Sequence, residues 1–228
     1  MDTDDLALIK RDGPCAVIEQ TPQLNLDQVA EELGVSPRDA LLGYDACVFV
    51  EGYSDVIFLE ALAATLKQAG LIPCDFKDKN IGILVVGGCG NLTYFVERRA
   101  FRSLRRNYGV FLDSDRQAPG APINQQRLAW KQQCETEGGK FYLTRKREVE
   151  NYLHPETLRR VTGRSDIPDF GDFDDVAQLI PWIPKKDLTG FFKWMTVDEI
   201  MERDRYIDDA GNERHELVEM IQDFLSLC

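Results

Sequence analysis

Acidic side chains follow two short apolar runs of this sequence, at the residues where each run stops. Glu51 comes directly after ACVFV, and Asp113 and Asp115 follow GVFL. Asp55 lies a few residues beyond Glu51, in V-E-G-Y-S-D. Carboxylates that converge repel one another unless positive charge lies between them. Because Mg²⁺ and Mn²⁺ take oxygen ligands of this kind, divalent-cation binding is the chemistry that these residues suggest.

Each of these acids also has an ordinary explanation. Asp55 alone is a favourable charge at a helix N-terminus, and a D-x-D pair occurs in many loops. Glu51 alone fits a surface residue at the end of a strand. The combination carries more weight, because a glycine-rich stretch follows another apolar run, in I-G-I-L-V-V-G-G-C-G-N.

The elements that would position these residues alternate along the chain. We expect strands at 46–50, 81–86, 109–112 and 140–143, and helices at 55–68, 92–106 and 125–136. This alternation predicts βαβ units, and therefore an α/β fold with a mainly parallel, four-stranded sheet flanked by helices. In such a fold ligands bind beyond the carboxyl ends of the strands, so the acids should share one edge.

The local backbone allows a finer placement of the acids. Gly52 permits a sharp turn, and Ser54 can cap the helix that follows. Asp55 then lies in the first turn, and its carboxylate should point back toward Glu51 because helical side chains lean toward the N-terminus. On an extended backbone, the two aspartates of D-S-D would project to the same side.

The two ends of the sequence differ from this middle part. The first residues contain one helical piece, Leu26–Leu33, and the strand–helix alternation lapses from Pro155 onward. Glu213–Leu227 has the pattern of an amphipathic closing helix. We therefore expect a lead-in segment at 1–45, a catalytic α/β domain at 46–155 and a helical C-terminal extension at 156–228.

Composition limits the class of protein. A hydrophobic fraction of 43% supports a packed core, and no apolar run approaches the ~20 residues that span a bilayer. The N-terminus lacks a signal-peptide profile and the six cysteines include no C-x-x-C pair, so we expect a cytoplasmic protein with no membrane association. The net charge of −12 argues against binding nucleic acid through global charge, but leaves room for local basic patches.

Two groups of basic residues could form such patches. The first lies on one side of the helix expected at 92–106 and comprises Arg98, Arg99, Arg102, Arg105 and Arg106. The second is Arg145-Lys146-Arg147, directly before Glu148 and Glu150. Both could contact DNA phosphates without reading bases. The alternative is that the arginine helix is a solvated face, or pairs with carboxylates of the chain itself.

Three of these segments together resemble the Toprim pattern: V-E-G-Y-S-D, V-V-G-G-C-G-N and F-L-D-S-D-R. Topoisomerases, bacterial primases and the OLD (overcoming lysogenization defect) nucleases share this pattern. The segment G-G-K-F-Y-L-T-R-K-R-E-V-E-N-Y-L, at 138–153, is similar to the R-E-x-E-N-Y-L segment of OLD nucleases in particular. The resemblance covers roughly residues 40–155 and implies a Toprim (Rossmann-like) fold.

The resemblance implies metal-dependent cleavage of DNA phosphodiester bonds, as an endonuclease or nickase that uses two Mg²⁺ or Mn²⁺ ions. The implied metal ligands are Glu51, Asp55, Asp113 and Asp115, with Glu51 and Asp113 as the central pair of the catalytic site. Glu148 and Glu150 follow the fourth strand and would complete the second metal site, although one of them could instead be a helix-start charge.

OLD nucleases also use a lysine late in the chain, near the metals. The candidates are Lys185, Lys186 and Lys193, each of which alone fits a solvated surface lysine. Lys193, in F-F-K-W-M-T, is favoured because apolar neighbours would hold its stem and aim the ammonium. Its expected role is to stabilise charge that builds up on the phosphate.

The resemblance also implies partners. OLD proteins join an ABC-type ATPase to a C-terminal Toprim nuclease, and this sequence contains no G-x-x-x-x-G-K-[ST] motif. We therefore expect the nuclease half of a longer protein that carries such an ATPase. A helicase partner and a homodimer formed through the rest of that protein are further expectations.

Two other functions compete with this one. A receiver-like phosphoacceptor domain has a similar sheet, but it would place paired acids after the first strand and a single aspartate after the third, whereas D-x-D follows the third strand here. A non-catalytic Toprim-like interaction module would dock partners without cutting DNA. The retention of all the acids argues against that second alternative.

Overall fold

The computed structural model describes residues 8–12, 15–19, 43–97 and 107–228, and the chain divides into two compact units, residues 1–44 and 45–228. In the first unit, strands β1 (Leu8–Asp12) and β2 (Cys15–Glu19) pair in antiparallel fashion. The sequence analysis did not predict this pair. The helical piece predicted at Leu26–Leu33 lies outside the described residues.

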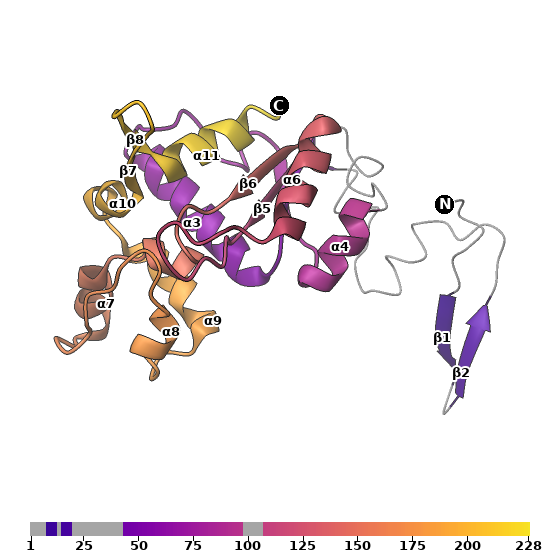
Figure 1. Ribbon diagram of the computed structural model, residues 1–228, viewed down its shortest axis with the longest axis horizontal. Coiled ribbons are helices and arrows are strands. Elements are labelled where there is room, and N and C mark those ends of the chain that lie inside the picture. The colour runs from indigo at the N-terminus through magenta and orange to yellow at the C-terminus, as the bar shows by residue number, and fades with distance from the viewer. Residues whose placement is uncertain (1–7, 13–14, 20–42, 98–106) are drawn as a thin grey trace. The chain divides into compact units, whose positions relative to one another are not determined.

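A four-stranded sheet forms the centre of the second unit (Figure 1). Its strands are β3 (Ala46–Val50), β4 (Ile81–Val85), β5 (Tyr108–Leu112) and β6 (Lys140–Leu143), in the order β4-β3-β5-β6. All three pairings are parallel. The predicted α/β fold with a parallel four-stranded sheet is confirmed, and the strand ends differ from prediction by at most one residue.

Helices cover both faces of this sheet (Figure 1). On one face, Ala46, Val48 and Val50 join the main core together with α3 (Tyr53–Gln68). On the other face lie α4 (Cys89–Glu97) and α6 (Gln125–Thr136), where the Tyr108 hydroxyl donates to the Cys134 carbonyl at 3.5 Å. Since side chains alternate along a strand, the fully buried run of β3 contributes to two separate cores.

The chain beyond β6 forms an extension made mostly of short helices, as predicted. Its elements are η2 (Val149–Tyr152), α7 (Pro155–Thr162), α8 (Val176–Leu179), α9 (Lys185–Leu188), η3 (Thr189–Trp194), α10 (Val197–Asp204), β7 (Arg205–Ile207), β8 (Glu213–His215) and α11 (Glu216–Leu225). The predicted closing helix begins later than expected, because its first residues form β8 and pair with β7. The division at residue 155 stays a prediction.

Phe58 of α3 joins the extension to the sheet. Its ring lies 4.7 Å from the ring of Phe192 in η3, 5.7 Å from Phe111 in β5 and 6.3 Å from Tyr152 in η2, measured between centroids. Each of these rings is at most 1% exposed. One aromatic cluster therefore connects three parts of the unit that are distant in sequence.

The closing helix α11 reaches the same face of the sheet by a close approach. A methyl group at Gly109 of β5 would lie only 2.6 Å from a ring carbon of Phe224. This position therefore requires glycine for space rather than for an unusual backbone angle. Val48 of the neighbouring strand pairs with Gly109, so α11 packs against the middle of the sheet.

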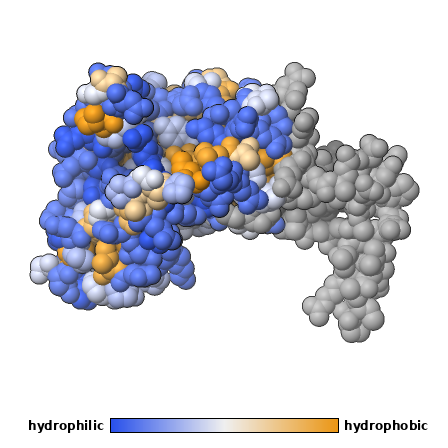
Figure 2. Space-filling view, viewed as in Figure 1, coloured by the Kyte–Doolittle hydropathy of each residue, from blue (hydrophilic) through white to orange (hydrophobic). Residues whose placement is uncertain are grey.

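The face of the molecule drawn in Figure 2 is mainly hydrophilic, with small and separate hydrophobic areas. Within the described residues, no helix combines the length and the apolar character needed to cross a bilayer.

We expect Phe58→Ala to lower the free energy of unfolding by about 3–5 kcal/mol, because it removes the ring that three other rings contact. Chemical denaturation followed by circular dichroism measures this loss. Leu179→Ala is the matched control: Leu179 is 38% exposed, so its truncation should change stability by less than about 1 kcal/mol. Equal effects of the two substitutions would contradict a central role for Phe58.

Candidate metal centre

Acidic residues from several elements meet at the carboxyl edge of the sheet. Glu51 follows β3, Asp113 follows β5, and Asp55 lies in the first turn of α3. The segments that follow β3 and β4 lie against each other here, since the Gly88 N–H donates to the Glu51 carbonyl at 3.1 Å. Gly88 and its neighbour Gly87 both have positive φ, which glycine adopts without strain.

Asp113 lies at the middle of this group. Burial raises the pKa of its carboxyl well above the usual range, and the negative charges of Asp55, Glu150, Glu148 and Asp115 raise it further. Its Oδ1 atom is buried and has no hydrogen-bond partner among the residues that the structure describes. A carboxylate in this setting is destabilised unless a cation lies beside it.

Asp55 points back toward the end of β3, as expected. The Gly52 N–H donates to its Oδ2 atom at 2.9 Å. The helix begins two residues earlier than predicted, so Gly52 is the N-cap residue and Ser54 is not. Burial raises the pKa of Asp55 to about 6, and the charge of Glu51 adds to this effect, while the hydrogen bond from Gly52 opposes it.

Glu148 and Glu150 both reach the same edge from the segment after β6. Asn151 holds this segment in place: its Oδ1 accepts from the Glu148 N–H at 3.1 Å, and its Nδ2 donates to the carbonyls of Gly171 and Asp174 at 2.8 and 3.0 Å. Burial raises the pKa of Glu150 to about 7, and its Oε2 atom is buried without a partner. Neither glutamate is therefore turned away from the group.

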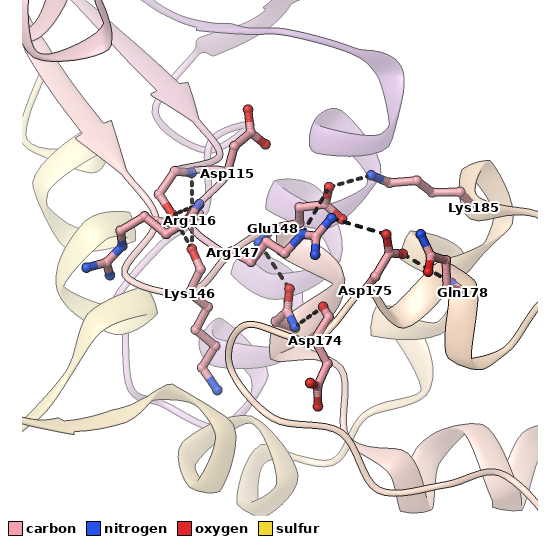
Figure 3. Close-up of polar contacts among 12 residues, drawn as sticks. Asp115, Arg116, Lys146, Arg147, Glu148, Asp174, Asp175, Gln178 and Lys185 are labelled. Atoms are coloured by element: carbon pink, nitrogen blue, oxygen red, sulfur yellow. Dashed lines mark hydrogen bonds and ion pairs between the residues drawn. The ribbon is translucent and has the colours of Figure 1, made fainter. Parts of the chain in front are cut away.

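Asp115 is placed differently from the extended arrangement expected for D-S-D. Its φ is +53°, a left-handed conformation that aspartate tolerates better than most residues, and its N–H donates to the Arg147 carbonyl at 2.9 Å. Its half-exposed carboxylate forms an ion pair with Arg127 of α6. Figure 3 shows Asp115 on the β5 side and Glu148 on the side of η2.

Lys185, at the start of α9, is the lysine that lies against the carboxylates. Its Nζ atom is 2.8 Å from Oε1 of Glu148 (Figure 3). Partial burial acts to lower the pKa of Lys185, but the hydrogen bond to Glu148 and the charges of Glu150 and Asp113 outweigh it, so the pKa is raised. The ammonium therefore stays charged at neutral pH.

Lys193, the lysine that the sequence favoured, is placed differently from Lys185. Lys193 is exposed, and its Nζ atom lies 5.4 Å from the centroid of the Trp194 ring. Its neighbours Phe192 and Met195 are buried, as the sequence suggested, but their burial turns the lysine between them outward. Lys186, the third candidate, is also exposed.

The basic cluster 145–147 does not act as one surface. Arg145 is exposed and lies 4.0 Å from the centroid of the Tyr206 ring, and Arg147 lies 3.1 Å from Asp175 and 3.9 Å from Glu148. Lys146 is 7% exposed, and its Nζ atom is 2.7 Å from Asp172. In this structure Lys146 therefore does not face a DNA backbone, whereas Arg145 is exposed.

The arginines of the first basic group, Arg98, Arg102 and Arg105 among them, lie outside the described residues.

Sequence reasoning missed Arg127 and Glu216. Arg127 could have been suspected, because the helix predicted at 125–136 must start at the same edge of the sheet as the strand ends. Glu216 gave no such signal. It is 3% exposed, accepts from the Arg145 N–H at 2.6 Å and from the Tyr152 hydroxyl, and so ties α11 to both ends of the segment that carries Glu148 and Glu150.

The residues present fit a hard divalent cation. In the portion of the chain that the structure describes, no three Asp, Glu, His or Cys side chains are already gathered closely enough to hold an ion. However, two buried carboxylate oxygens, on Asp113 and Glu150, have no partner, and Mg²⁺ and Mn²⁺ prefer such ligands. Arg127 and Lys185 form ion pairs with two of the acids, Asp115 and Glu148.

Solved structures and one family model are similar to this chain. No curated protein matches the chain. The C-terminal region of the Burkholderia pseudomallei OLD protein is similar in structure over 80% of this chain and 98% of that one, with 14% identity and a TM-score of 0.46. The C-terminal region of the Xanthomonas campestris pv. campestris OLD protein is similar over 82% and 97%, with 15% identity and a TM-score of 0.41. Residues 44–115 match the family model of the TOPRIM domain of overcoming lysogenization defect protein-like proteins.

Proposed function

We propose that this chain is a metal-dependent DNA endonuclease or nickase that hydrolyses phosphodiester bonds. The observation that carries the proposal is the convergence of buried carboxylates at one edge of the sheet, with unpartnered oxygens on Asp113 and Glu150. A group of acids that is unfavourable by itself is retained where it binds something positive.

The proposed ligands of two Mg²⁺ or Mn²⁺ ions are Glu51, Asp55, Asp113, Asp115, Glu148 and Glu150. When bound, such ions supply a water of lowered pKa and compensate the charge on the leaving oxygen. The chain itself supplies orientation. Gly52 fixes Asp55 through its N–H group, and Asn151 fixes Glu148 in the same way.

Lys185 supplies a positive charge in addition to that of the ions. Because its pKa is raised, it keeps its proton and can stabilise the charge that develops on the phosphate. Arg145 and Arg147 extend positive charge outward from the centre and would contact the DNA backbone, together with Arg98, Arg102 and Arg105.

The chain would act as the nuclease half of a protein that also carries an ABC-type ATPase, with a helicase partner and homodimerisation as further proposals. We place it in the cytoplasm, where thiols stay reduced, and Cys47, Cys74, Cys134 and Cys228 are free thiols. A non-catalytic interaction module is the second candidate. It would bind DNA in a metal-dependent way without cutting it.

We expect the purified chain to nick or cut supercoiled plasmid with Mg²⁺ or Mn²⁺, and Asp113→Asn to reduce the rate at least about 100-fold. The same substitution removes a buried charge, so the melting temperature in EDTA should stay equal or rise. Asp209→Asn, at an exposed position, is the control. An intact plasmid with either metal, or full activity of Asp113→Asn, would rule out the nuclease and leave the interaction module.

The two lysines provide a matched pair. Lys185→Ala should lower the cleavage rate by about 10²–10³-fold, the usual effect of removing one group that stabilises transition-state charge. Lys193→Ala should leave the rate within about twofold of the parent, since this lysine contacts only an exposed tryptophan in the interactions described above. Single-turnover plasmid cleavage measures both, and the reverse order of the two effects would restore Lys193 to the site.

The raised pKa values of Asp55 and Glu150 predict a pH dependence in the metal-free protein. Both are higher in the folded state, so the folded state binds more protons and loses stability as pH rises from about 4 to about 7. Glu150→Gln removes one of these groups. In EDTA, the free energy of unfolding of Glu150→Gln minus that of the parent should therefore increase between pH 5 and pH 8, by up to ~3 kcal/mol.

Denaturant unfolding of both proteins at the two pH values measures this difference. Mn²⁺ should stabilise the parent more at pH 8 than at pH 5, because the ion must displace the protons that these acids hold. A stability difference that is the same at both pH values would show that Glu150 does not titrate in this range.

A further inference from the structure

A cavity of about 420 Å³ adjoins the candidate metal centre. It lies between the segment after β5 and the first turns of α6, and its lining includes Ser114, Asp115, Asn124, Gln126, Arg127 and Trp130. This volume falls within the ~300–1,000 Å³ of typical small-molecule sites, and it is large enough for the sugar-phosphate of one nucleotide. Asp115 belongs both to the cavity and to the acidic group, so a ligand here would be contiguous with one at the metals.

The wall formed by α6 favours an anion. Arg127 lies in the first turn of this 12-residue helix and is only 7% exposed. Asn124 caps the helix by accepting from the Gln126 N–H at 2.8 Å through Oδ1, and its Nδ2 group carries two further donors. The positive end of the helix dipole adds to the charge of the guanidinium.

Asp115 has two competing uses. In this structure its carboxylate forms an ion pair with Arg127. The same carboxylate is a proposed metal ligand, and it cannot serve a metal fully while it holds the guanidinium. When Asp115 turns to a metal ion, the largely buried Arg127 loses one negative neighbour, and an anion that enters the cavity would take that place.

We propose that this cavity is a phosphate subsite for the DNA backbone, in which Arg127 exchanges Asp115 for a phosphate of a nucleotide that neighbours the cleaved bond. The inference rests on the proposed function and names a substrate contact of that same site. Since binding linkage is reciprocal, phosphate on Arg127 would release Asp115 for metal, and metal on Asp115 would release Arg127 for phosphate. DNA binding would in this way assemble the ligand set.

The exchange can be tested in EDTA, without catalysis. Asp115→Asn removes the carboxylate that competes for Arg127, so it should tighten binding of a short fluorescein-labelled DNA duplex, measured by fluorescence anisotropy. Any lost negative charge near DNA also raises affinity, and Glu51→Gln measures that general effect. The effect that depends on Arg127 is the part of the gain in DNA affinity that disappears when Asp115→Asn is combined with Arg127→Gln.

We expect a coupling of about tenfold between positions 115 and 127, within the range for residues in contact, and near-additive effects for positions 51 and 127. Arg127→Lys, which keeps the charge, should retain part of the coupling. Asn124→Ala should weaken DNA binding but leave the coupling between positions 115 and 127 unchanged. Melting temperatures verify that each variant is folded, and Arg127→Lys replaces Arg127→Gln if the latter unfolds.

Additive effects at 115 and 127 would overturn the subsite. So would equal coupling at 51 and 127, because it would show only a general charge effect. Plasmid cleavage by the parent separates the two proposals: a protein that cuts DNA but shows no specific coupling retains the proposed function and loses the subsite. Competition by millimolar inorganic phosphate that is abolished in Arg127→Gln, without any coupling for the duplex, would mark a site for free phosphate and would also overturn it.

Discussion

The crowding of negative charge at one edge of a parallel sheet is the constraint around which this molecule is arranged. Parallel strands bring their carboxyl ends together, and here the ends of β3, β5 and β6 each lead into acidic residues. Burial raises the pKa of Asp113, and the negative charges of four other carboxylates raise it further. Such a group is stable only if cations or protons compensate it.

The structure supplies part of this compensation from its own side chains. Lys185 lies against Glu148, Arg127 against Asp115, and Arg147 between Glu148 and Asp175. The remaining buried oxygens of Asp113 and Glu150 have no such partner. The proposed divalent-ion site rests on this unequal compensation.

The C-terminal extension is part of this arrangement. It contributes Lys185 directly, and Glu216 of α11 accepts from the Arg145 N–H and the Tyr152 hydroxyl, at the two ends of the segment that carries Glu148 and Glu150. Its stability and the geometry of the acids are therefore coupled. A description limited to the strands and their flanking helices would leave the second half of the proposed ligand set without support.

The sequence by itself determined the four strands of the central sheet and the edge where the acids lie, because short apolar runs between glycines identify buried parallel strands and strand direction then places their ends. The choice among basic residues was decided only by the tertiary structure. Lys146 and Lys193 had favourable neighbours in sequence, but the bends that follow β6 bury the first and the packing of Phe192 and Met195 exposes the second. Lys185 reaches Glu148 from a helix that is distant in the chain, and this long-range contact depends on how that helix packs, which local sequence patterns do not encode.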